Sequence, residues 1–121
     1  MNNIIAVFIG GGLGSLARFG ISIFVYEKFK SMFPLATLIS NVSSCLILAL
    51  TVLFFGDKLG LNPGLRMLIL TGFCGGFSTF STFSFETVEL IRSGNFIFAG
   101  VNIMISMSLC LVLIMVLTKN T

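Results

Sequence analysis

The sequence predicts an all-α integral membrane protein with four transmembrane helices, and three observations lead to this fold class. Hydrophobic residues make up 56% of the 121-residue chain, charged residues make up only 9%, and the mean hydropathy is +1.12. Soluble proteins are roughly a quarter charged, so such a surface suits lipid better than water. The few charges and turn-forming residues divide the chain into four apolar runs, each long enough to cross a hydrocarbon layer of about 30 Å.

The first two runs are separated by a charged stretch and a proline. We expect the first span at Ile4–Tyr26 and the second at Leu35–Phe55, because the charges at 27–30 and Pro34 fall where membrane helices reach the headgroups. The first run follows two asparagines with no basic leader, so we expect it to remain as a helix and not to be removed as a signal peptide.

The third span is expected at Leu65–Ile91 and the fourth at Phe96–Leu117, which leaves one transmembrane domain over residues 1–121. The middle of the third span, Thr71–Ser84, contains three glycines and six serines or threonines. Non-helical backbone is tolerated inside a membrane where it lines a cavity or binds an ion, so the pattern favours a helix broken near 75–80. The alternative is an unbroken helix whose small residues allow close packing.

A helix broken in mid-membrane leaves free carbonyls, which suit a cation, and free amides, which suit an anion. Phe77, Phe80 and Phe83 follow at three-residue spacing, so the rings of Phe80 and Phe83 share one face of a helix after the break. Ring edges carry partial positive charge and can contact a small anion. With 14 phenylalanines in the chain, lipid contact and packing are the alternative roles.

Polar residues inside the other spans are further candidates. The amide of Asn41 can donate to an anion or to a neighbouring helix. Arg18 lies inside the first span and could attract anions at a vestibule or extend to the interface. Asn102, Ser106 and Ser108 give the fourth span a similar polar edge.

Two other patterns favour packing over chemistry. The Gly10–Gly14 segment lies in an apolar run without a preceding strand, so it suits close helix contact better than phosphate binding. Cys45, Cys74 and Cys110 lie within apolar runs and are expected to be small packing residues, not a disulfide framework. Glu89 and Arg92 are spaced for a local ion pair.

Composition argues against enzymes and nucleic-acid binding. The chain has no histidine, only four carboxylates and no Cys-x-x-Cys, so we expect no enzymatic activity. Its net charge of +3 is dispersed, so no nucleic-acid partner is expected.

The two sides of the membrane carry equal numbers of basic residues, so these charges do not favour one direction of insertion. Insertion in both directions, with antiparallel pairing of two copies, is therefore a hypothesis. The residues counted are Lys58, Arg66 and Lys119 on one side and Lys28, Lys30 and Arg92 on the other.

Three motifs, taken together, resemble the Fluc (CrcB) family of fluoride channels over the whole chain. They are Gly11-Gly12-Leu13-Gly14-Ser15-Leu16-Ala17-Arg18, Thr37-Leu38-Ile39-Ser40-Asn41 and Gly72-Phe73-Cys74-Gly75-Gly76-Phe77-Ser78-Thr79-Phe80-Ser81-Thr82-Phe83. Ala36 departs from the pattern, because a glycine commonly begins the second motif in this family.

The resemblance implies a fluoride-selective channel of the cell membrane that exports fluoride passively from the cytoplasm and protects against its toxicity. It also implies an antiparallel dimer with two pores, formed with a second copy or a paired homologous subunit, and a structural sodium ion at its centre. By motif, backbone carbonyls of Gly75 and Ser78 would bind sodium, and Arg18 would be a vestibule or structural cation. The pore residues implied are Phe80, Phe83 and Asn41, with Thr37, Ser81, Thr82 and Ser108 as candidate hydrogen-bonding groups.

Two other functions compete with this interpretation. A small drug–proton exporter also has four helices, but it needs a carboxylate deep in the first span, and Ile4–Tyr26 contains none. A non-transporting assembly subunit would leave the hydroxyl-rich third span unexplained.

Overall fold

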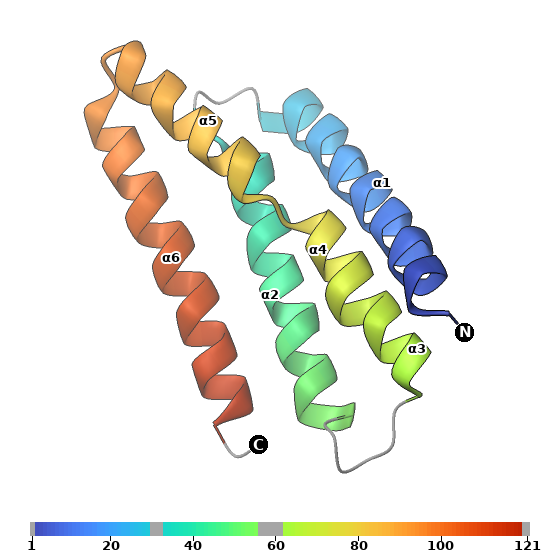
Figure 1. The fold of residues 1–121 in the computed structure, drawn as a ribbon. Helices are drawn as coiled ribbons and strands as arrows, with labels where there is room; N and C mark the ends of the chain where they lie inside the picture. The colour runs from blue at the N-terminus through green and yellow to red at the C-terminus, as the bar shows by residue number, and fades with distance from the viewer. Residues whose placement is uncertain (1, 30–32, 56–61, 120–121) are drawn as a thin grey trace.

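The computed structural model describes residues 2–29, 33–55 and 62–119, and every regular element in these ranges is helical (Figure 1). Four helical segments are long and apolar enough to cross a membrane, as predicted. The first is α1 (Asn3–Phe29) and the second is α2 (Leu35–Phe55). The fourth is α6 (Phe96–Thr118), which ends at the same side of the bundle at which α1 begins (Figure 1).

The third span is a series of shorter elements. It begins with α3 (Pro63–Arg66), where the side chain of Asn62 accepts from the Gly64 amide at 2.8 Å. The π-helical segment η2 (Met67–Phe73) and α4 (Cys74–Phe77) continue it without a gap. After two extended residues, α5 (Phe80–Arg92) completes the crossing.

The predicted break therefore lies at Ser78 and Thr79. Their backbone angles are φ −94° and ψ 154° for Ser78, and φ −151° and ψ 124° for Thr79, which are values of extended chain. Thr79 then begins α5 as its N-cap, because its side chain accepts from the Thr82 amide at 3.4 Å. The third helix is thus broken, as the glycines and hydroxyls indicated, and is not an unbroken packing helix.

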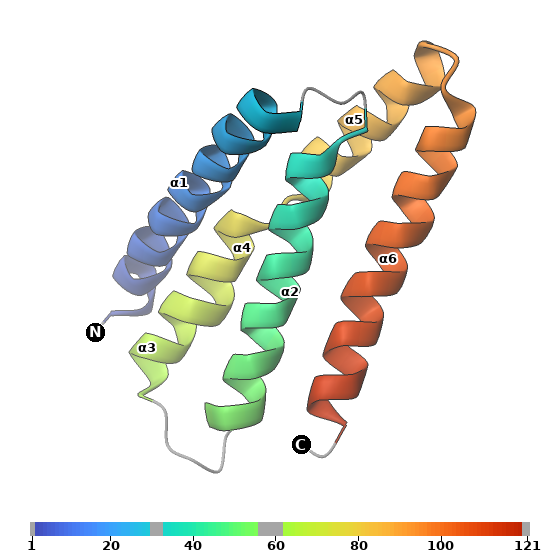
Figure 2. The same ribbon diagram turned by 180° about the vertical axis from the view of Figure 1, so that it is seen from behind.

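The break sends the two halves of the third span to different neighbours. Figures 1 and 2 show η2 and α4 running beside α1, whereas α5 turns away and runs toward the start of α6. The helix α2 packs against α1, α4 and α6 and so lies at the centre of the bundle.

Glycines bring α1 and the first half of the third span into backbone contact. A β-carbon on Gly10 would clash with the Leu68 carbonyl oxygen, and one on Gly14 would clash with the Phe73 carbonyl oxygen. From the other side, a β-carbon on Gly72 would lie 2.9 Å from the α-carbon of Gly10. The Gly10–Gly14 segment is therefore a close packing surface.

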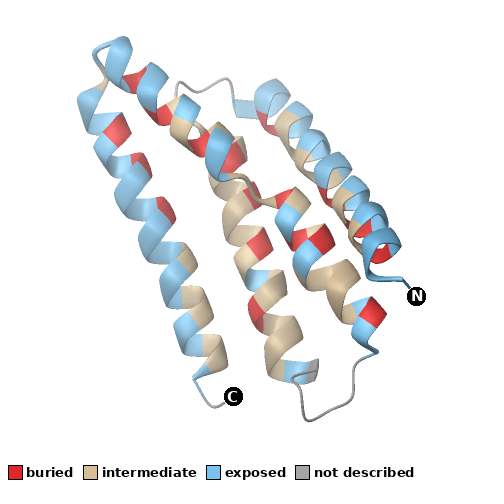
Figure 3. Ribbon diagram, viewed as in Figure 1, coloured by how far each residue is buried: buried red, intermediate tan, exposed pale blue. Residues whose placement is uncertain are grey.

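Large apolar side chains lie mainly on the outside of the bundle and several polar side chains are buried inside it, the reverse of the usual arrangement in a soluble protein. Most large apolar side chains of α1 and α6 are exposed on the single chain, and buried positions are marked in red on the inner faces in Figure 3. Small polar side chains are prominent among the buried residues: Thr37, Ser40, Ser44, Thr87, Asn102 and Ser106. This arrangement suits a multi-pass membrane protein, in which lipid covers the outside and polar groups bond between helices.

The turn before α6 follows from local sequence. Gly94 adopts φ +86°, a left-handed conformation that glycine reaches without strain, and so ends α5. Arg92 lies 3.7 Å from Glu89 at the end of α5, which confirms the expected local ion pair.

Candidate functional site

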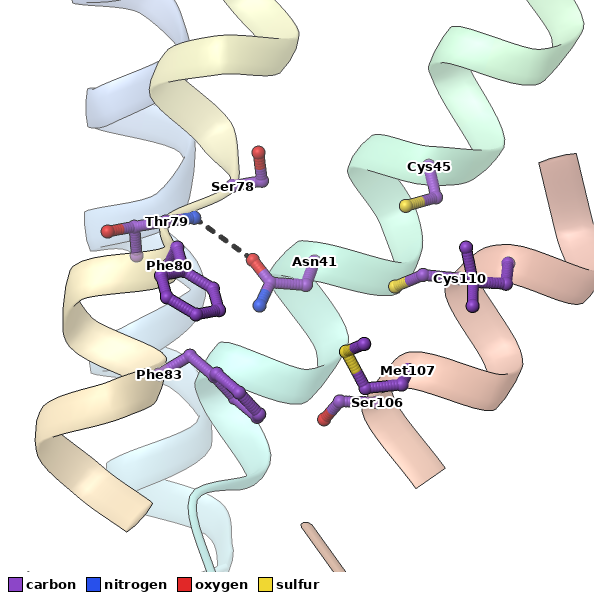
Figure 4. A pocket seen from close by; sticks show the side chains of 10 residues that line it. Asn41, Cys45, Ser78, Thr79, Phe80, Phe83, Ser106, Met107 and Cys110 are labelled. Atoms are coloured by element: carbon purple, nitrogen blue, oxygen red, sulfur yellow. Dashed lines mark hydrogen bonds between the residues drawn. The ribbon is translucent and has the colours of Figure 1, made fainter. Parts of the chain in front are cut away.

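A groove of about 240 Å³ lies where the break in the third span faces α2 and α6 (Figure 4). We call it the break groove. Its lining residues come from three spans: Asn41, Cys45, Ser78, Thr79, Phe80, Phe83, Ser106, Met107, Cys110 and Leu111. Three of the predicted pore residues, Asn41, Phe80 and Phe83, thus lie around one space.

Asn41 is tied to the break by a hydrogen bond that fixes its orientation. The backbone amide of Thr79 donates to Oδ1 of Asn41 at 3.1 Å. An amide N–H must meet an oxygen, so the Nδ2 group of Asn41 is left on the groove side, as Figure 4 shows. Among the described residues Nδ2 has no hydrogen-bond partner, so Asn41 offers the groove two donor hydrogens.

The same hydrogen bond frees a carbonyl. In an uninterrupted helix, the Thr79 amide would donate to the Gly75 carbonyl, four residues earlier. Because it donates to Asn41 instead, the Gly75 oxygen loses its helical partner. Gly75 is exposed, and a β-carbon there would meet nothing within 4 Å, so the residue lies in an open position.

The carbonyl of Cys74, by contrast, is fully engaged. It accepts from the Ser78 amide at 3.0 Å, from the Ser78 hydroxyl at 2.9 Å and from the Ser44 hydroxyl at 2.9 Å. The end of α4 is therefore held firmly to α2, and the hydroxyl of Ser78 is occupied inside the protein. The hydroxyl hydrogen of Ser78 is therefore used, and its hydroxyl and backbone oxygens can still accept or coordinate a further partner.

Arg18 also stabilises the end of α4. Its Nε donates to the Gly76 carbonyl at 3.3 Å, and the side chain is half-buried. A cation at the C-terminal end of a helix is favourable, because the last carbonyls carry partial negative charge. This hydrogen bond joins α1 to α4, and the vestibule and structural roles expected for Arg18 both stay predictions.

The two phenylalanines differ in burial. Their ring centroids are 5.9 Å apart and the ring planes are inclined at 40°. Phe83 is only 8% exposed, whereas Phe80 is 76% exposed on the single chain. Both rings line the break groove, but a second molecule or lipid must cover much of Phe80.

A buried series of hydrogen bonds joins α6 to α5 beside the groove. Ser106 donates to Oδ1 of Asn102 at 3.3 Å, and Nδ2 of Asn102 donates to the Thr87 hydroxyl at 3.0 Å. The Thr87 hydroxyl donates in turn to the Phe83 carbonyl at 2.8 Å. This series fixes the helical turn that carries the Phe83 ring.

The remaining predicted track residues lie outside the lining of the groove. Ser108 is exposed on α6, and Ser106 occupies the groove in its place. Ser81 is exposed and Thr82 is half-buried on the first turn of α5. Thr37 is buried beside Glu86. In the described part of the chain, two buried side-chain oxygens have no hydrogen-bond partner: Oε1 of Glu86 and the hydroxyl of Ser40.

Sequence patterns alone missed the sulfur atoms of the groove. Cys45 and Cys110 were expected to be ordinary packing residues, but both line the break groove with Met107. The spacing of Ser106 and Cys110, four residues apart on one helix face, was the available signal.

The chain is similar to known proteins over most of its length. A family model described as CrcB-like protein, Camphor Resistance (CrcB), matches residues 5–118. Among curated relatives, the fluoride-specific ion channel FluC of Coxiella burnetii (strain CbuK_Q154) is 39% identical over 110 residues, covering 90% of this chain and 89% of the relative. Fluoride-specific ion channel FluC 1 of Yersinia pestis is 42% identical over 107 residues, covering 88% and 84%. The FluC of Serratia proteamaculans (strain 568) is 40% identical over 113 residues, covering 93% and 88%.

Proposed function

Since the chain belongs to the CrcB family, whose members are ion channels and not enzymes, we propose that it is a fluoride-selective channel whose anion path runs through the break groove. The observation that carries this proposal is the hydrogen bond from the Thr79 amide to Asn41. This hydrogen bond occupies the oxygen of the Asn41 side chain and leaves its NH₂ group facing the groove. A hydrogen-bond donor at this position selects for an anion.

The backbone at the break adds to this preference. The first amides of a helix have no intrahelical acceptor, and the N-terminal end carries partial positive charge. Helix α5 is 13 residues long and begins at Phe80, on the groove lining. The N-terminus of α5 therefore favours an anion beside Asn41.

Fluoride is small and strongly hydrated, so a selective path must replace water with several donors at once. The Asn41 amide supplies donors from one side, and the edge of the Phe83 ring supplies polarised C–H groups from another. Larger halides gain less from such close donors and fit less well between the rings. This account makes Phe80, Phe83 and Asn41 the groups that determine selectivity.

The transport direction follows from acid–base chemistry. Hydrogen fluoride crosses membranes as a neutral weak acid and dissociates in a near-neutral cytoplasm, where fluoride then accumulates. A passive pore is sufficient to let it leave along its electrochemical gradient. We therefore propose protection against fluoride toxicity as the role of the channel in the cell membrane.

We further propose that two copies, or one copy and a paired homologous subunit, associate antiparallel and form two pores. The 76% exposure of Phe80 supports a partner, because a pore-lining ring must be enclosed. The balance of basic residues between the two sides of the membrane permits insertion in either direction.

A structural sodium ion fits the residues at the break. Sodium is a hard cation and prefers oxygen ligands, and the Gly75 carbonyl lacks its helical partner in an open position. The carbonyl of Ser78 lies three residues later, in the extended backbone directly after α4. Two copies meeting at their breaks would supply two carbonyls each, and the bound ion would supply positive charge that stabilises the non-helical backbone.

Efflux from liposomes that contain only this purified chain tests the function. We expect rapid release of fluoride, measured with an ion-selective electrode, and far slower release of chloride under the same gradient. Equally fast chloride release would contradict selectivity, and absence of fluoride release would contradict the channel assignment for this chain alone.

A further inference from the structure

Three sulfur-containing side chains line the break groove between α2 and α6. Cys45 comes from α2, and Met107 and Cys110 come from α6. Figure 4 shows the three sulfur atoms directed into the same space, with the thiols of Cys45 and Cys110 facing each other across it. Neither thiol is in a disulfide, and both residues are half-buried.

We propose that Cys45 and Cys110 bind a soft, thiophilic metal cation, with the mercuric ion as the model ligand, which bridges α2 to α6 across the groove. The donor types determine this choice. The lining residues described above include two thiols and a thioether but no carboxylate and no imidazole, so hard cations find no charged ligand among them.

The charge balance suits a site within a membrane. On binding Hg²⁺, the S–H bond of each cysteine breaks, two Hg–S bonds form, and two protons pass to water. The product is electrically neutral, so the low dielectric of the bilayer does not oppose it as it would oppose an unpaired ion. The Met107 sulfur can add a third, uncharged soft contact.

The third cysteine offers a matched control. Cys74 is buried on α4 and is not part of the groove lining. It lies on a different helix from Cys45 and Cys110, so its removal leaves the groove pair intact. Serine variants at the three positions therefore separate a bridged site from the reactivity of single thiols.

The metal would also block the channel, and this part rests on the proposed function. A cation fixed between Cys45 and Cys110 narrows the space that contains Asn41 and Phe83. Fluoride passing through this groove would be stopped, so the channel would be sensitive to thiophilic metals.

Binding is measured first, on purified protein in detergent, by titration with Hg²⁺. The signals are the near-ultraviolet Hg–S absorption and the number of thiols still reactive. Wild type and Cys74→Ser should each lose both groove thiols to one ion per chain. Cys45→Ser and Cys110→Ser should bind about 10² to 10⁴ times more weakly, because the second ligand no longer acts intramolecularly. Equal affinity in all four proteins would overturn the site.

Fluoride efflux with and without Hg²⁺ then tests the block, each protein being compared with its own untreated rate. We expect inhibition of wild type and Cys74→Ser, and resistance of Cys45→Ser and Cys110→Ser. If Hg²⁺ bridges the two cysteines but fluoride efflux is unchanged, the metal site stands and the anion path through the groove is overturned. An inactive untreated wild type would overturn the channel assignment, while the titration would still decide on the metal site.

Discussion

The two halves of the third span are packed in opposite ways. The first half, η2 and α4, touches α1 backbone to backbone, through glycines that leave no room for a β-carbon. The second half, α5, is held to α6 by the hydrogen-bonded side chains of Thr87, Asn102 and Ser106, and borders an open groove. One half is thus a close-packed support, and after the break the other half borders the groove with the rings of Phe80 and Phe83.

The largest effect on stability is expected in the first half of the third span, where η2 and α4 pack tightly against α1. Gly14→Ala would place a β-carbon against the Phe73 carbonyl and 2.8 Å from the Phe77 amide nitrogen, forcing the helices apart. We expect a loss of about 3 kcal/mol or more in stability, seen as a much lower midpoint of thermal unfolding in detergent. Gly12→Ala is the matched control, because a β-carbon there meets nothing within 4 Å. Similar losses from both variants would show that the glycine contact is not special.

The next largest effect is expected beside the open groove, at the side-chain amide of Asn41 on α2. Asn41→Asp keeps an oxygen for the Thr79 amide but replaces the groove-side donor with negative charge. Losing a hydrogen bond to an ion costs about 2 to 3 kcal/mol. We therefore expect fluoride efflux through Asn41→Asp to be on the order of 100-fold slower than through wild type, at similar thermal stability. Asn95→Asp, in the turn before α6, is the control and should leave efflux near the wild-type rate. Undiminished efflux from Asn41→Asp would remove Asn41 from the path.

Substitutions of Phe80 and Phe83, both on α5, are expected to affect fluoride conduction and protein stability differently. Phe83→Ile should slow fluoride efflux about tenfold and also lower stability, because the Phe83 ring is buried. Phe80→Ile should slow efflux with little change in the stability of the single chain, because its ring is exposed there. Both quantities come from one preparation, by efflux and thermal unfolding. If the double variant retained full fluoride efflux, neither ring could line the path.

The smallest effect is expected on α6, where two serines lie two residues apart. Ser106→Ala removes a buried donor to Asn102, worth about 1 kcal/mol, and should slow fluoride efflux several-fold. Ser108→Ala alters an exposed position and should leave efflux unchanged. The reverse ranking would restore Ser108 as the pore hydroxyl and would require a different rotation of α6.

The sequence was sufficient for features that depend on composition along one span. Hydropathy and the charged turns placed all four crossings, and the glycines and hydroxyls around Gly75 and Ser78 located the break. The close packing role of Gly10 and Gly14 also followed, because small residues in an apolar run have few other uses.

Features that depend on how one helix rotates against another could not be read from the chain. Helix α6 is apolar on nearly all sides, so its sequence gives a weak signal for whether Ser106 or Ser108 turns inward. The hydrogen-bond partner of Arg18, the Gly76 carbonyl, also depends on how α1 packs against α4. Likewise, Cys45 and Cys110 are far apart in sequence and meet only because α2 packs against α6.

In the proposed anion path, the break turns Thr79 toward Asn41, and the amide of Asn41 receives the anion. The decisive measurement is an experimental structure of the purified protein in fluoride-containing buffer. We expect extended backbone at Ser78 and Thr79, and an anion in contact with Nδ2 of Asn41 and the edge of the Phe83 ring. A continuous third helix, with the Thr79 amide donating to the Gly75 carbonyl, would contradict the proposed path.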